Sequence, residues 1–104
     1  MITQLKKGVL ELCVLALLSK EERYGYELVT LISEEIEVTA GTIYPLLKRI
    51  KEEGFVETET RDSPGGPSRK YYRLTGKGRQ TFAQNVDEWN CFYIKINKII
   101  GGNV

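Results

Sequence analysis

The stretch GTIYPLLKRIKEEGF, residues 41–55, decides the fold of this chain. Its apolar residues recur at the spacing of one helix face: Ile43, Leu46, Leu47 and Ile50. Such a pattern predicts an amphipathic helix, which we expect over residues 40–53. Thr39 is suited to be its N-cap, and Gly54 is a natural residue to end it.

A helical wheel defines what this helix presents on its other side. Opposite the apolar stripe lie Gly41, Pro45, Lys48 and Glu52, flanked by Tyr44 and Lys51 on one side and by Thr42 and Arg49 on the other. Pro45 is tolerable only near the helix start, where we expect a slight kink with Tyr44 held outward. A face that begins small and then turns cationic suits a nucleic-acid groove, because lysine and arginine neutralise phosphates. An ordinary solvated surface is the alternative interpretation.

The surrounding segments place this helix in a larger unit. Residues 4–19 are apolar almost all round a helix and should be central, and apolar spacing predicts a second helix over about residues 24–36. After the quoted stretch, alternating residues predict a strand at 55–61 and a returning strand at 69–74. The DSPGGPS segment between them is expected to be a flexible loop, too long for a two-residue turn. Three helices followed by a β-hairpin are the order of a winged helix-turn-helix, a mainly α fold with a β-hairpin.

A last helix is predicted after residue 76. Its large apolar residues follow the 4-3 spacing of a coiled coil: Phe82, Val86, Trp89, Tyr93, Ile96 and Ile100. Phe92 and Ile99 widen this stripe beyond what a small core can cover. The helix either folds back on the first helix or, as we favour, forms a dimer interface. We therefore expect a winged helix-turn-helix over residues 1–76 and a dimerisation helix over residues 77–104.

Composition narrows the possible functions. The 104 residues suffice for one domain, with no histidine and a net charge of +1. We find no nucleophile beside a base, no metal constellation and no phosphate loop, so neither an enzyme nor a cofactor is expected. Cys13 and Cys91 are expected to be buried, reduced thiols. No apolar run reaches the roughly 20 residues of a membrane span and MITQLKK is no signal peptide, so a cytoplasmic protein is expected.

Charge is unevenly distributed despite the small net value. The segment SRKYYRLTGKGR, residues 68–79, contains five basic residues and no acid. The acids gather elsewhere, for example at residues 34–37 and 87–88. A nearly neutral chain can therefore present one basic face on the predicted hairpin.

Four features together resemble the PadR-like transcriptional regulators. They are YGYEL (24–28), GTIYPLLKRIKEEGFV (41–56), GGPSRKYYRLTGKGR (65–79) and a terminal helix bearing Trp89. The chain is most similar to the short subfamily with a single C-terminal helix. The resemblance implies a homodimeric repressor on a pseudo-palindromic operator, with the third helix in the major groove and the hairpin along the adjacent backbone or minor groove.

The resemblance also implies roles for individual residues. Its DNA-contacting positions are Thr42, Tyr44 and Lys48 on the recognition helix, Ser68, Arg69 and Lys70 on the wing, and Tyr24 at a phosphate. In a multidrug-binding member of the family, paired tryptophans sandwich planar aromatic ligands, which implies a planar aromatic inducer at Trp89 and Tyr93. Alternatively, Trp89 belongs to the dimer core, with Phe92 and Tyr93 filling the pore. A winged-helix protein–protein interaction module without DNA binding is the alternative function.

Overall fold

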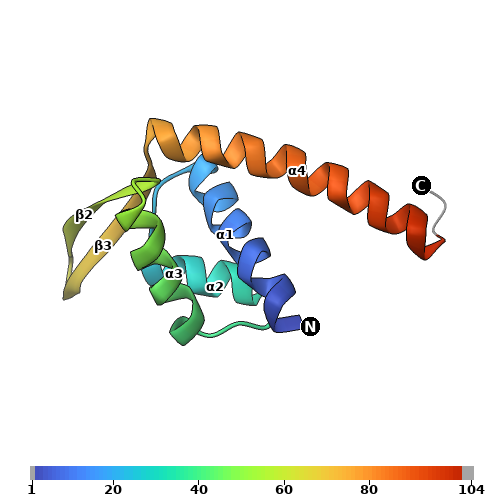
Figure 1. Ribbon diagram of the computed structural model, residues 1–104. Coiled ribbons are helices and arrows are strands. Elements are labelled where there is room, and N and C mark those ends of the chain that lie inside the picture. The colour runs from blue at the N-terminus through green and yellow to red at the C-terminus, as the bar shows by residue number, and fades with distance from the viewer. Residues whose placement is uncertain (1, 102–104) are drawn as a thin grey trace.

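The computed structural model describes residues 2–101, and the side chains from residue 8 onward (Figure 1). The elements within this range are α1 (Ile2–Lys20), β1 (Arg23–Tyr24), α2 (Gly25–Ser33), α3 (Ala40–Glu52), β2 (Val56–Ser63), β3 (Gly66–Leu74) and α4 (Gly76–Ile100). The strands form an antiparallel sheet in the order β1-β3-β2. The predicted mainly helical fold with a β-hairpin is confirmed. The expected domain limits at residues 1 and 104 lie outside the described residues.

The core joins the first three helices to the base of the hairpin. Its buried members are Leu10, Val14, Leu15, Leu18, Leu28, Val29, Ile32, Ile43, Leu47, Ile50, Val56, Tyr72 and Leu74. On α3 the predicted stripe is buried except for Leu46, which packs partly exposed at the edge of the core. Each fully buried leucine or isoleucine contributes about 1.5–3 kcal/mol, so this stripe fixes α3 against the body.

The predicted ends of α3 are confirmed, with one difference in chemistry. Thr39 occupies the N-cap position, but its side chain makes no capping hydrogen bond; its carbonyl oxygen accepts from the amides of Thr42 and Ile43. Gly54 has φ +82°, the left-handed conformation that glycine adopts readily. The helix continues through Pro45, in its second turn.

Two features of the α2 region differ from the prediction. The helix ends at Ser33 rather than near Ile36, because a tight turn follows, in which the amide of Ile36 donates to the carbonyl of Ile32 at 2.8 Å. Tyr24 lies outside α2, in the short strand β1 that pairs with Tyr71 of β3. A two-residue strand carries no periodicity, so the sequence pattern gave no sign of it.

The prediction of a long hairpin loop is wrong. Ser63 pairs with Gly66, which leaves Pro64 and Gly65 as a two-residue connection. Proline fixes φ at the first corner of such a turn, and Gly65 supplies the positive φ of +70° that the second corner of a type II turn requires. The remaining polar residues of the segment continue the two strands, with a register irregularity between Arg61 and Ser63.

Helix α4 begins on the body and then leaves it. Thr75 caps its start, its hydroxyl accepting from the amide of Gly78 at 3.0 Å, and Phe82 packs partly buried against the core. Beyond that point the helix diverges from α1, and its C-terminal part projects away from the other elements (Figure 1). Large apolar side chains are consequently exposed along it: Trp89, Phe92, Tyr93, Ile94, Ile96, Ile99 and Ile100.

The projection of α4 also corrects the expectation for the cysteines. Cys91 is exposed because it lies on the part of α4 that has left the core. Cys13 is half-buried in α1, and burial raises the pKa of its thiol. No helix in residues 2–101 combines the length and the apolar character needed to cross a membrane.

Candidate nucleic-acid interface

A basic, tyrosine-rich depression lies where the start of α2, helix α3 and the hairpin meet. It has a volume of about 470 Å³ and is lined by Tyr24, Gly25, Tyr26, Tyr44, Ser68, Arg69, Lys70 and Tyr72. Three segments far apart in sequence thus contribute to one surface. Most of the residues expected to contact DNA lie in this depression, from both the recognition helix and the wing.

The ring of Tyr44 packs closely on Gly25, which has no side chain. A Cβ atom at Gly25 would lie 2.8 Å from Cε1 of the Tyr44 ring, closer than such atoms can approach. Tyr44 remains 41% exposed, so one side of its ring packs on α2 while the other faces outward. Tyr44 therefore points outward only in part, as its exposure shows. The rest of its ring packs on α2, where Gly25 leaves room for it.

The basic residues of the hairpin are held differently from one another. The guanidinium of Arg69 lies over the ring of Tyr24, 4.6 Å from its centroid, as a cation–π pair. The hydroxyl of Ser68 donates to Oδ1 of Asp62 at 3.0 Å, while Lys70 is exposed. Burial, with a smaller contribution from Tyr44, raises the pKa of Tyr72.

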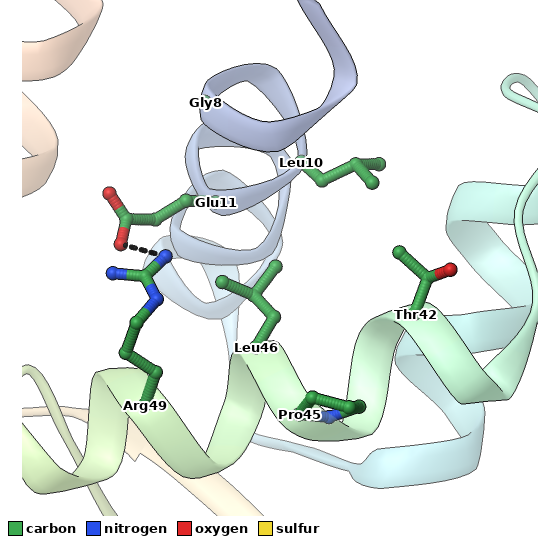
Figure 2. Close-up of a pocket in the computed structure, with 7 residues that line it drawn as sticks. All are labelled: Gly8, Leu10, Glu11, Thr42, Pro45, Leu46 and Arg49. Atoms are coloured by element: carbon green, nitrogen blue, oxygen red, sulfur yellow. Dashed lines mark ion pairs between the residues drawn. The ribbon is translucent and has the colours of Figure 1, made fainter. Parts of the chain in front are cut away.

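Lys48 and Thr42 lie on different flanks of α3. Lys48 is exposed one turn beyond Tyr44, on the same side of the helix, but it does not line the depression. Thr42 instead lines a second cavity of about 630 Å³ between α1 and α3, together with Pro45 and Leu46 (Figure 2). Thr42 therefore lies apart from the residues that line the depression, whereas Lys48 follows Tyr44 on α3 without lining it.

An ion pair closes one end of the α1–α3 cavity. Nη2 of Arg49 lies 2.9 Å from Oε1 of Glu11, across the space between the two helices (Figure 2). Arg49 also pairs with Glu53 at 3.4 Å on its own helix. Because Arg49 is engaged by two carboxylates, it is less available to other anions than the neighbouring Lys48.

Residues 68–79 contain no acid in sequence, but in the structure acidic side chains of the neighbouring strand lie beside them. Nε of Arg73 lies 2.9 Å from Glu57, and Nη1 lies 3.1 Å from Glu59, both on the neighbouring strand β2. Hydrogen bonds from Arg61 and Arg73 lower the pKa of Glu59, so its carboxylate stays ionised. Strand pairing thus confines the free positive charge of the hairpin to its outer half, at Arg69 and Lys70.

The residues predicted to bind a ligand or form a dimer lie on α4. Trp89 is 39% exposed and, with Phe92, lines a cavity of about 530 Å³ against Gly8, Val9 and Leu12 of α1. Tyr93 does not line this cavity; its ring lies beside that of Trp89, with centroids 6.1 Å apart. In the part of the chain that the structure describes, no group of histidine, cysteine or acidic residues could hold a metal ion.

Comparisons with known proteins bear on this surface. Residues 14–84 match the family described as "Transcriptional regulator PadR-like family". The "Negative transcriptional regulator PadR" of Bacillus subtilis (strain 168) is 34% identical over 76 residues, which are 69% of this chain and 42% of that protein.

Solved structures share the fold. A PadR-like transcriptional regulator from Bacillus cereus strain ATCC 14579 has a TM-score of 0.85 and 39% identity, over 96% of this chain and 99% of that one. Bacillus subtilis PadR in complex with operator DNA has a TM-score of 0.68 and 31% identity, over 73% of this chain and 44% of that one.

Proposed function

Since this chain belongs to the PadR-like family of transcriptional regulators, we propose that it is a homodimeric repressor that binds a pseudo-palindromic DNA operator. One observation carries the proposal: Tyr44, Arg69 and Lys70, from two separate elements, line a single basic depression, and the exposed Lys48 follows Tyr44 one helical turn later. The solved operator complex of Bacillus subtilis PadR supports it by analogy. Residues up to about 76 would bind DNA, and the rest would form the dimer.

In this proposal, helix α3 contacts bases in the major groove and the hairpin contacts the DNA backbone. Helix α3 would enter the major groove with Tyr44 and Lys48 on the flank that faces the wing and Thr42 on the other flank. Ser68, Arg69 and Lys70 would contact phosphates from the hairpin. Tyr24, under Arg69, would meet a phosphate at the start of α2, where unpaired amide groups favour an anion.

Dimerisation would bury the exposed stripe of α4. Ile99 is 81% and Ile100 75% exposed in the single chain, and monomeric proteins rarely leave so continuous an apolar surface in water. The heptad positions Val86, Tyr93 and Ile96 would pack against the partner. A two-fold dimer of this kind holds the two recognition helices about one turn of DNA, ~34 Å, apart.

The proposal predicts operator binding that depends steeply on salt. The protein should select pseudo-palindromic duplexes from a random library and run at twice the chain mass in size-exclusion chromatography with light scattering. If roughly 6–10 phosphates are neutralised, affinity for a selected duplex should fall ~10³-fold or more between about 50 and 200 mM salt, because counterions are released on binding. Fluorescence anisotropy measures this change. A flat salt response, or selection that yields no duplex, would contradict the proposal.

We further propose that planar aromatic molecules bind in the α1–α4 cavity and release the DNA. Trp89 offers a rigid aromatic platform in the lining of this cavity, and we expect a ligand held between α1 and α4 to shift the helix that sets the dimer geometry. Trp89 is the chain's single tryptophan, so its fluorescence should be quenched by planar aromatic cations or phenols at micromolar concentration. Unchanged fluorescence across a broad panel would contradict ligand binding at Trp89.

A further inference from the structure

A continuous chain of contacts runs across the outer face of the sheet. The carboxylate of Glu22, in the loop after α1, pairs with the guanidinium of Arg61 on β2. That guanidinium lies over the ring of Tyr71, 4.4 Å from its centroid. The Tyr71 ring meets Tyr24 edge to face at 5.7 Å, and Tyr24 in turn carries the guanidinium of Arg69 at 4.6 Å. Glu22 on the body is thus connected to Arg69 near the tip of the wing.

Glu22 also reaches the second strand of the hairpin. Its other carboxylate oxygen lies 3.7 Å from Nη1 of Arg73 on β3. Arg73 and Arg61 share Glu59 between them, at 3.1 and 3.0 Å. One carboxylate from outside the hairpin therefore joins an ionic network that spans both of its strands.

The wing needs such an anchor because only its base is packed. Val56, Tyr72 and Leu74 are buried, whereas every residue from 64 to 70 is exposed. A small rotation at the base therefore moves Arg69 and Lys70 by a larger distance. Contacts with DNA that tolerate little misplacement would be weakened by this freedom, since ordering the wing on binding costs conformational entropy.

We propose that Glu22 is a positioning residue for DNA binding. It fixes the angle of the wing through Arg61 and Arg73, and the tyrosine stack holds Arg69 in place. The negative charge of Glu22 by itself disfavours DNA binding, because phosphates repel it. Its positioning of the wing favours binding, so the two effects have opposite signs. The inference rests on the proposed DNA-binding function.

The test compares two neutralised glutamates that are neighbours in sequence. Glu22→Gln should bind a library-selected, fluorescein-labelled duplex about two- to five-fold more weakly than wild type, because the ion pairs that it loses are exposed and individually weak. Glu21→Gln is the matched control, because Glu21 pairs with Arg23, which keeps Glu27 as a second partner. Loss of one exposed negative charge that does not contact the hairpin should leave Glu21→Gln unchanged or up to about two-fold tighter, because salt screens such charges.

A double-variant cycle separates positioning from general loss of structure. If Glu22 acts by placing Arg69, then Glu22→Gln should lose most of its effect in an Arg69→Ala background. Thermal unfolding of the single variant, followed by circular dichroism, should remain within a few degrees of wild type.

Two results would overturn the inference. One is binding by Glu22→Gln that is equal to or tighter than wild type, and the other is a full loss that simply adds to that of Arg69→Ala. Failure of wild type to select any duplex would instead remove the proposed function, so the two failures are distinguishable.

Discussion

Replacing Lys48 and Arg69 together with glutamate is expected to abolish operator binding. Each protomer loses two phosphate-neutralising groups and gains two charges that DNA repels, and the dimer doubles the change. We expect affinity for a selected duplex to fall ~10³-fold or more at about 100 mM salt, because phosphate contacts dominate such binding. Anisotropy titration measures the loss, with light scattering to show an unchanged dimer mass. Neither side chain belongs to the exposed stripe of α4.

The matched control reverses the same number of charges elsewhere. Lys20, at the end of α1, and Arg79, near the start of α4, are exposed and do not line the depression. Their double glutamate variant should weaken binding by no more than about ten-fold, since salt screens charges beyond a Debye length of about 10 Å. Equal losses from the two pairs would show that net charge governs binding, without a defined site. A protein that never binds DNA and captures a protein partner would support the interaction-module alternative.

Gly78→Ala is expected to destabilise the fold more than any other glycine-to-alanine change described. Gly78 is buried at the start of α4, where a Cβ atom would overlap the carbonyl oxygen of Phe55 and lie 2.9 Å from its carbonyl carbon. That carbonyl also accepts the amide of Thr75 at 3.1 Å, so the backbone cannot retreat without losing a hydrogen bond. We expect a loss of about 3 kcal/mol or more in the free energy of unfolding, measured by urea denaturation.

Gly76→Ala provides the comparison on the same helix. No atom lies within 4 Å of a Cβ built at Gly76, and its φ is not in the left-handed region. Alanine there should leave stability within about 1 kcal/mol of wild type, with a small gain from lower unfolded-state entropy. Similar unfolding curves for the two variants would contradict the assigned close approach between α4 and residue 55.

Local patterns in the sequence predicted the elements whose stability is local in origin. The apolar spacing of α3, its N-cap position and Gly54 were all legible, because each depends on residues within one or two turns. The extended stripe of α4 was legible for the same reason. The candidate site was predicted in part: the residues of α3 and the hairpin were named, but their grouping required the fold.

Contacts between distant residues were not predictable in this way. Arg73 pairs with Glu57 and Glu59, 16 and 14 residues away, so the basic hairpin of the sequence is partly neutralised in the structure. The pairing of β1 with β3 and the exposure of Cys91 also depend on how whole elements dock. No sequence pattern indicated that Gly25 has a structural role, because its role is to leave room for the ring of Tyr44, which lies 19 residues later in the chain.

The two-residue turn at Pro64 and Gly65 gives the hairpin a fixed length. Its strands are paired up to Ser63 and Gly66, so the span from base to tip is set by residue count rather than by the slack of a loop. An antiparallel strand advances about 3.4 Å per residue, which equals the rise per nucleotide along the axis of a DNA duplex. Adding two residues to each strand would keep every side chain on its present face and move the tip outward by about 7 Å.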